Sequence, residues 1–120
     1  MKKFLAVCAL ATLSLSTVAM SAADTTAGTA SEAIMKRQWP EAESLLRQGL
    51  AQNPNDASRL LNLAFVLQNT DRSAEAAKVY QQILQLQQNP VVAVADPYTL
   101  GQPARAKRLA KQGMASLETK

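Results

Sequence analysis

The chain has 120 residues, of which 13 are basic and 9 acidic, and its single cysteine is Cys8. It contains no histidine and only 4 glycines, which form no phosphate-binding loop. These counts exclude Ser-His-Asp and Cys-His catalytic arrangements and the usual zinc ligand sets. The composition therefore predicts no cofactor and no metal site, and it argues against an enzyme.

Residues 1–23 are typical of a cleaved signal peptide. Two lysines precede an apolar stretch from Phe4 to about Leu15, and small residues follow at 19–23. A membrane anchor is the alternative, but hydroxyl side chains interrupt the stretch, which falls short of the roughly 20 apolar residues of a spanning helix. We expect a periplasmic protein, and an extracellular one is also compatible. Cleavage removes Cys8, so no disulfide would support the mature fold.

The segment after the signal peptide has a weaker pattern. Residues 24–30 are rich in Thr and Ala and are expected to form a flexible leader. Residues 31–37 predict a short helix with few apolar positions. Pro40 suits the first turn of a second helix, where its missing N–H group costs nothing.

Two apolar stripes then recur 34 residues apart. In both stripes the positions follow i, i+3, i+4, i+7 and i+8, which places five side chains on one face of an α-helix. This recurrence predicts a helical repeat protein, a class that acts by binding. The first stripe comprises Ala42, Leu45, Leu46, Gly49 and Leu50, and the second comprises Ala76, Val79, Tyr80, Ile83 and Leu84.

Turn signals divide this region into helices. The sequence Asn53-Pro54-Asn55-Asp56 predicts a turn and an N-cap for a helix over about 57–68. Polar residues 69–73 predict a second turn, and the next helix is expected to run to about residue 88.

The positions around the stripes match a known repeat motif. The series Leu60-x2-Leu63-Ala64-x2-Leu67, followed by Ala76-x3-Tyr80, reads like W-x2-L-G-x2-Y followed by A-x3-F. The chain therefore resembles the tetratricopeptide repeat family, and in particular its small secreted bacterial members. The resemblance covers roughly residues 28–90 and implies two repeats, at about 31–55 and 56–90.

The array is expected to stop after Pro90. Residues 91–102 combine β-branched residues with Pro and Gly and predict a linker, and residues 103–120 predict an amphipathic basic helix. Because two repeats bury little apolar surface, we expect this helix to cap the array. The fold class is all-α, a short α-solenoid of two helix pairs with a C-terminal capping helix. Apolar positions of the cap are Ala106, Leu109, Ala110, Gly113, Met114 and Leu117.

The first helix of each pair lines the inner face of such an array, where partners lie in the proteins that this chain resembles. The helix over 57–68 directs Ser58, Leu61, Asn62, Phe65 and Gln68 away from its core stripe. Leu61 and Phe65 are neighbours there, and the core pattern does not require them to be apolar. They predict a groove for a protein or peptide partner, with the amides bonding its backbone. The alternative is that both residues pack on the first helix or on the leader.

The C-terminal helix offers a second surface, formed by Arg105, Lys107, Arg108 and Lys111. Residues 24–103, in contrast, carry six basic and eight acidic residues. The basic surface suits an acidic partner or an anionic membrane, and the alternative is a solvated helix face. The stripe of this helix is poor in aromatic residues, which disfavours membrane insertion, and the modest charge disfavours nucleic acid.

These features predict a non-enzymatic adaptor or scaffold of the bacterial cell envelope that binds a protein or peptide through its groove. One branch of the resembled family grips a C-terminal carboxylate with Lys and Asn at the places of Leu61 and Phe65, so the resemblance does not extend to that clamp. Two alternatives stay open: binding of a membrane surface or acidic partner through the basic helix, and a self-assembling subunit. A short array can cover its ends by pairing as a homo-oligomer.

Overall fold

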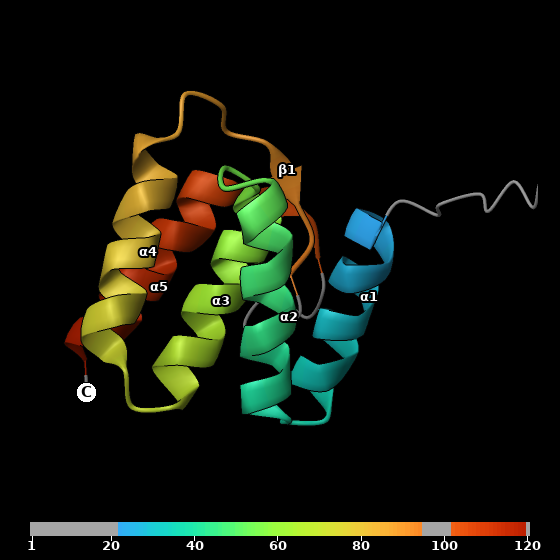
Figure 1. The fold of residues 1–120 in the computed structure, drawn as a ribbon. Helices are drawn as coiled ribbons and strands as arrows, with labels where there is room; N and C mark the ends of the chain where they lie inside the picture. The colour runs from blue at the N-terminus through green and yellow to red at the C-terminus, as the bar shows by residue number, and fades with distance from the viewer. Residues whose placement is uncertain (1–21, 95–101, 120) are drawn as a thin grey trace, which may run out of the picture.

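The computed structural model describes residues 22–94 and 102–119. The expected signal peptide lies outside these ranges except for its last two residues, as does much of the expected linker. Within the described residues the chain forms five helices and two short strands, which confirms the all-α class (Figure 1). The elements are α1 (Ala22–Met35), α2 (Trp39–Gln52), α3 (Ala57–Asn69), α4 (Ser73–Gln85), β1 (Val91–Val92), β2 (Ala104–Arg105) and α5 (Ala106–Glu118).

The helices pack as two consecutive hairpins followed by a single helix. Helix α1 pairs with α2, α3 pairs with α4, and α2 packs on α3 to join the hairpins. Helix α5 packs on α4 and α3, in the same way that α3 packs on α2 and α1. Helix α5 therefore stands where the first helix of a third pair would stand, and it covers the end of the array.

Helix boundaries depart from the expected ones at three places. Helix α1 begins at Ala22, so the expected flexible leader at 24–30 is helical instead. Ala30 of this segment is fully buried where α1 packs on α2. Tertiary packing of this kind stabilises helices that local sequence leaves marginal. Helix α4 ends at Gln85 rather than near 88, and α5 begins at Ala106 rather than 103.

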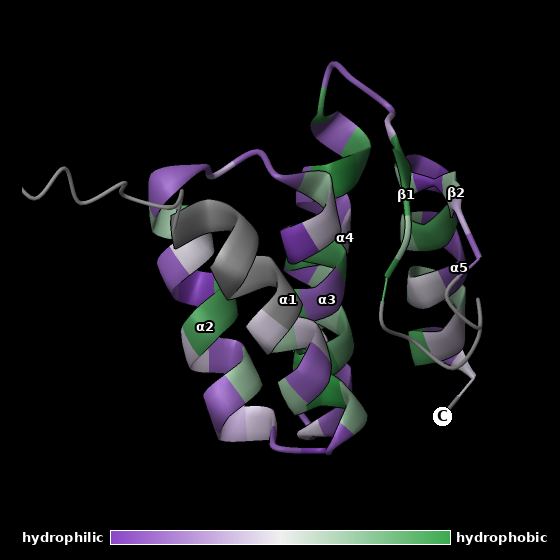
Figure 2. Cartoon of the chain, turned by 90° about the vertical axis from the view of Figure 1, so that its right-hand side faces the viewer, coloured by the Kyte–Doolittle hydropathy of each residue, from purple (hydrophilic) through white to green (hydrophobic). Residues whose placement is uncertain are grey.

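Part of the expected linker is a strand that the sequence analysis did not predict. Strand β1 pairs with β2 in antiparallel register, with Val91 opposite Arg105 and Val92 opposite Ala104. Figure 2 shows this ribbon beside α5, on the far side of α3 and α4 from α2. The pairing ties the segment after α4 to the start of α5, and it carries Val94 into the buried core.

The turn inside each helix pair has the same backbone geometry. Arg37 and Asp71, which are 34 residues apart, both adopt the left-handed conformation, with φ of 58° and 59°. A residue of this kind ends a helix while satisfying its last carbonyls. The repeat is therefore preserved in the backbone as well as in the apolar stripes. In each turn the next residue donates to the carbonyl five residues earlier: Gln38 N–H to Ala33 O at 2.8 Å, and Arg72 N–H to Leu67 O at 3.0 Å.

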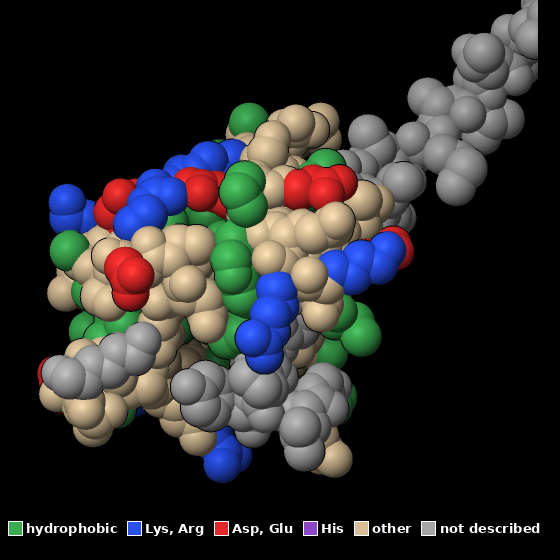
Figure 3. All heavy atoms as spheres, turned by 90° about the horizontal axis from the view of Figure 1, so that it is seen from below, with side chains coloured by type: hydrophobic (Ala, Val, Ile, Leu, Met, Phe, Trp, Pro, Cys, Tyr) green, Lys and Arg blue, Asp and Glu red, His purple; other side chains and the backbone are tan. Residues whose placement is uncertain are grey.

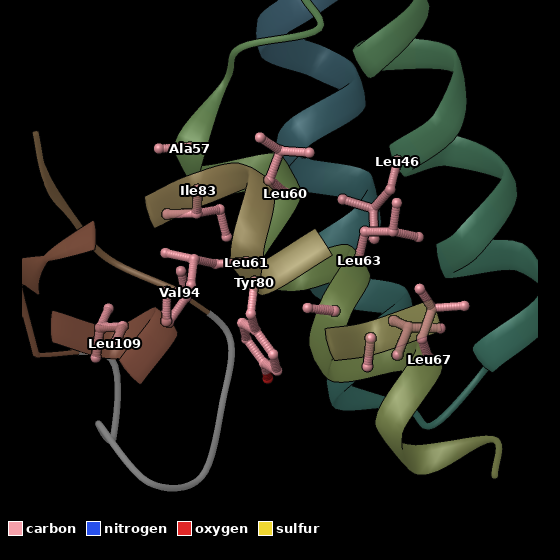
Figure 4. Packing of buried hydrophobic residues seen from close by; sticks show 14 of the residues in the cluster. Leu46, Ala57, Leu60, Leu61, Leu63, Leu67, Tyr80, Ile83, Val94 and Leu109 are labelled. Carbon is pink, nitrogen blue, oxygen red and sulfur yellow. The ribbon is translucent and has the colours of Figure 1, made fainter. Parts of the chain in front are cut away.

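The predicted stripes form the core. Leu46, Val66, Leu67 and Ile83 are the largest side chains that are almost completely enclosed, and they come from α2, α3 and α4 (Figure 4). Gly49 of α2 allows a close approach, because a Cβ atom there would lie 2.3 Å from the Arg59 side chain of α3. The core is thus continuous from one hairpin to the next.

Asp56 holds the start of α3, and Asp56→Ala is expected to cost about 1–2 kcal/mol of unfolding free energy. The carboxylate accepts a hydrogen bond from the Arg59 N–H group at 3.1 Å and also pairs with the Arg59 guanidinium. Urea unfolding followed by circular dichroism measures the loss. Asp56→Asn keeps a cap acceptor and should lose less, so equal losses for both variants would contradict the capping role.

Candidate binding surfaces

The predicted groove residues on α3 are less accessible than the sequence analysis expected. Leu61, Asn62 and Gln68 are buried, with exposed fractions of 4%, 5% and 5%. Ser58 and Phe65 are half-buried. The expectation of one open face is therefore corrected for three of the five side chains, whereas a partner-binding role for this face stays a prediction.

Residues from beyond the second repeat cover Leu61. Val94 and Leu109 belong to the same buried cluster, and Figure 4 shows Val94 beside Leu61 with Leu109 of α5 on the same side. Position 61 lies outside the core stripe of the repeat pattern, and the predicted alternative was packing on the first helix or the leader. The structure places Leu61 in the core, because the chain after β1 and helix α5 pack over the inner side of α3.

Gln68 joins three helices through a chain of hydrogen bonds. The Tyr80 hydroxyl of α4 donates to Gln68 Oε1 at 3.1 Å, and Gln68 Nε2 donates to Ser116 Oγ of α5 at 2.9 Å. The Ser116 hydroxyl donates in turn to the Gly113 carbonyl at 2.6 Å. A buried amide needs such partners, because an unsatisfied polar group costs free energy. Gln68 therefore positions α4 and α5 on α3.

Phe65 is partly exposed to solvent and packs against an aromatic residue of α2. Its ring meets the Trp39 ring edge to face, with centroids 6.0 Å apart and planes at 73°. Both side chains are half-buried. Sequence analysis placed Phe65 against the first helix or the leader as its alternative, but its ring partner is the first residue of α2. The half-buried residues of the predicted groove are therefore Ser58 and Phe65, and Trp39 is a neighbour that the sequence analysis did not assign to it.

The predicted basic surface borders a shallow hollow of about 760 Å³, called here the basic hollow. The four predicted cations all contribute to its lining, so the structure brings them together on one site. Leu84 of α4 and two amide side chains complete the lining, and the sequence analysis assigned none of these three to a surface. The lining comprises Leu84, Asn89, Arg105, Lys107, Arg108, Lys111 and Gln112.

Asn89 ties the segment after α4 to the start of α5, next to the basic hollow. Its side-chain Oδ1 accepts a hydrogen bond from the Lys107 N–H group at 3.0 Å, in the first turn of α5. The Arg105 guanidinium donates to the Asn89 carbonyl at 3.0 Å, and Ala106 N–H donates to the Pro90 carbonyl at 2.9 Å. Asn89 comes before the expected linker, so its role could not be read from the helical period of α5.

A second charged cluster, the α2–α4 ion-pair cluster, joins the two hairpins. Glu43 of α2 receives hydrogen bonds from Arg47 and from Arg72, which lies just before α4. Arg72 also binds Glu75 at 2.8 Å, and Arg47 lies 3.8 Å from Glu75. Figure 3, which views the molecule from below, shows acidic and basic side chains side by side along one margin. The long-range pairs of this cluster join residues about 30 positions apart, so the helical period could not predict them.

The α2–α4 ion-pair cluster predicts a pH dependence of stability. Burial raises the pKa of Glu43, but hydrogen bonds from Arg47 and Arg72 outweigh this and hold it below its ordinary value of 4.5. A folded pKa below the unfolded one stabilises the fold above the unfolded pKa, and this contribution disappears as pH falls through the folded pKa. Glu43→Gln should therefore lower the unfolding free energy by about 1 kcal/mol at neutral pH. As the pH falls, this variant should lose less further stability than the unmodified protein does.

Urea midpoints measured from pH 7 down to about pH 3 test this dependence. Glu41→Gln is the matched control, because Glu41 lies on the same helix and is not part of any described ion pair. A Glu43→Gln variant whose stability falls as steeply in acid as that of the unmodified protein would contradict the assignment.

Across 22–94 and 102–119 no group of three or more acidic or metal-ligating side chains could hold a metal ion. In the same part of the chain no helix combines the length and apolarity that crossing a bilayer requires.

Comparison with known proteins gives one match. A family model described as tetratricopeptide repeat matches residues 33–95, which include α2, α3 and α4. Neither the curated proteins nor the solved structures gave a match.

Proposed function

Because the chain belongs to the tetratricopeptide repeat family, whose domains generally bind proteins, we propose that it is a non-enzymatic adaptor or scaffold of the bacterial cell envelope. The match over residues 33–95 is the observation that carries this proposal. The absence of histidine from the whole chain, and of cysteine beyond Cys8, supports a binding role over catalysis.

The partner-facing part of the predicted groove comprises its two half-buried residues, Ser58 and Phe65, and Trp39 of α2 extends it through its ring contact with Phe65. Aromatic side chains that are partly exposed supply much of the binding energy in protein interfaces. Leu61, Asn62 and Gln68 support this face from inside the core.

Site-specific photo-crosslinking in living cells tests the adaptor role. A photoreactive phenylalanine analogue at Phe65 should form an adduct with one discrete envelope protein, because the ring is partly exposed. The same analogue at Gln48, an exposed position on α2, is the matched control. Identical adducts at both positions, or none at either, would contradict the proposal, and an adduct between two copies of this chain would identify a self-assembling subunit.

Export is the second part of the proposal. The support is the order of lysines, apolar stretch and small residues in 1–23. Cleavage after residue 23 removes only the first two residues of α1 and keeps the buried Ala30, so it is compatible with the packed hairpin. N-terminal sequencing of the protein from a periplasmic extract should give a start near residue 24. An intact Met1 would exclude cleavage.

A further inference from the structure

The basic hollow gathers four cations, Arg105, Lys107, Arg108 and Lys111, on one surface. Among the described residues, ion pairs involve Lys36, Arg47, Arg59 and Arg72. No described carboxylate lies within ion-pair distance of the four cations of the hollow. Like charges gathered in a concave surface raise the local concentration of anions.

The charges are held on a fixed support. The opposite face of α5 packs Ala106, Leu109 and Ala110 into the core. Asn89 Oδ1 and the Pro90 carbonyl accept hydrogen bonds from the backbone N–H groups of Lys107 and Ala106, which fixes the first turn of this helix. A surface that is already ordered loses less conformational entropy when a partner binds.

We propose that the basic hollow binds an acidic segment of a partner protein, and this proposal rests on the adaptor function above. Aspartate or glutamate side chains of the partner pair with Arg105, which directly precedes α5, and with Arg108 and Lys111 of α5; the three follow one another at intervals of three residues. Arginine suits this role because its planar guanidinium binds carboxylates through two parallel hydrogen bonds. An apolar side chain of the same segment packs on Leu84.

Shape and charge favour a peptide over a membrane or a nucleic acid. A concave surface of about 760 Å³ accepts protruding side chains, whereas a lipid surface is broad and flat. Membrane-surface helices insert an apolar face, but α5 uses its apolar face inside the core. Residues 24–103 carry more acidic than basic side chains, which disfavours a polyanion as long as a nucleic acid.

Fluorescence anisotropy of labelled peptides tests the proposal on protein purified from cells expressing the full chain. The probe is a peptide of Glu-Asp-Leu repeats, and the matched probe of Gln-Asn-Leu repeats has the same shape without charge. We expect binding of the acidic probe only, weakened by added salt because exposed charges are screened. Equal binding of both probes would overturn the proposal.

Charge reversal locates the site. Arg108→Glu with Lys111→Glu should weaken binding of the acidic probe by about tenfold or more, because attraction becomes repulsion. Arg37→Glu with Lys78→Glu is the matched control, with the same charge change at exposed positions outside the hollow, and it should change the affinity less than about threefold. Exchanging the two cations, as Arg108→Lys with Lys111→Arg, should retain binding. Equal losses in the reversed and control variants would contradict the site.

Two further results separate the possible failures. Vesicles containing anionic lipid should not bind the protein. If they bind the unmodified protein but not the Arg108→Glu, Lys111→Glu variant, the ligand of the basic hollow is a membrane surface and not an acidic peptide. If no acidic probe binds but the crosslink at Phe65 still forms, the basic hollow assignment is wrong and the adaptor function stands. If the crosslink at Phe65 is also absent, the basic hollow assignment and the adaptor function are both wrong.

Discussion

Leu61→Asp is expected to unfold the protein, whereas Phe65→Asp leaves it folded. Leu61 is 4% exposed and lies in the buried cluster with Val94 and Leu109, so the new carboxylate would have to enter an apolar core. Burial of an unpaired charge costs several kcal/mol, which is comparable with the total stability of about 5–15 kcal/mol of a small domain. Phe65 is half-buried, and a carboxylate there can reach water.

Circular dichroism and urea unfolding distinguish these outcomes. Leu61→Met is the matched control, because it keeps the side chain apolar and close in volume and should cost less than about 1.5 kcal/mol. A Leu61→Asp variant that unfolds cooperatively near the midpoint of the unmodified protein would mean that Leu61 faces solvent. That outcome would restore the open groove that the sequence alone predicts.

Gly113→Ala is expected to lower the unfolding free energy by about 1–3 kcal/mol, the range for overpacked cores. In an exposed helix interior the same change stabilises by about 0.5–1 kcal/mol, because alanine is the better helix former. The sign reverses here because a Cβ atom on Gly113 would lie 2.3 Å from Cζ of the Tyr80 ring. Tyr80 is enclosed by the core and bonded to Gln68, so its ring has little room to move.

A double-mutant cycle with Tyr80→Leu tests the cause. Tyr80→Leu alone costs stability, because it removes the ring and the hydrogen bond to Gln68. In the Tyr80→Leu background the penalty of Gly113→Ala should disappear, since the clashing ring atoms are gone. Thermal unfolding measures all four proteins. A penalty that persists without the ring would place the conflict elsewhere in α5, and stabilisation by Gly113→Ala alone would contradict the close contact.

The two surfaces differ in how their residues are presented. The inner face of α3 is largely covered by the cluster that includes Val94 and Leu109, and its half-buried part is aromatic. The basic hollow lies on the outer side of the α4–α5 contact and is lined mainly by charged side chains. A protein with two chemically distinct surfaces is suited to hold two partners, or two parts of one partner, at the same time.

Local sequence was sufficient for the features that depend on neighbours along the chain. The 34-residue recurrence of apolar positions determines the helix pairs, because an amphipathic helix must bury one face. The turn before Asp56 marks the start of α3 for the same local reason, whereas the predicted start of the C-terminal helix at 103 was three residues too early. The spacing of the four cations at 105–111 likewise placed them near one another, and in the structure all four line the basic hollow.

Tertiary structure decided which side chains are buried and which elements cover them. Leu61 looked like a surface residue because its cover includes Val94 and Leu109, which are more than 30 residues away in the sequence. Glu43 and Arg72 are 29 residues apart, and periodicity carries no information about such long-range contacts. The short β ribbon and the helical state of residues 24–30 follow from packing on other elements rather than from local propensity. Sequence by itself therefore determined the repeat and its charges, whereas only the folded arrangement determined which faces stay open to a partner.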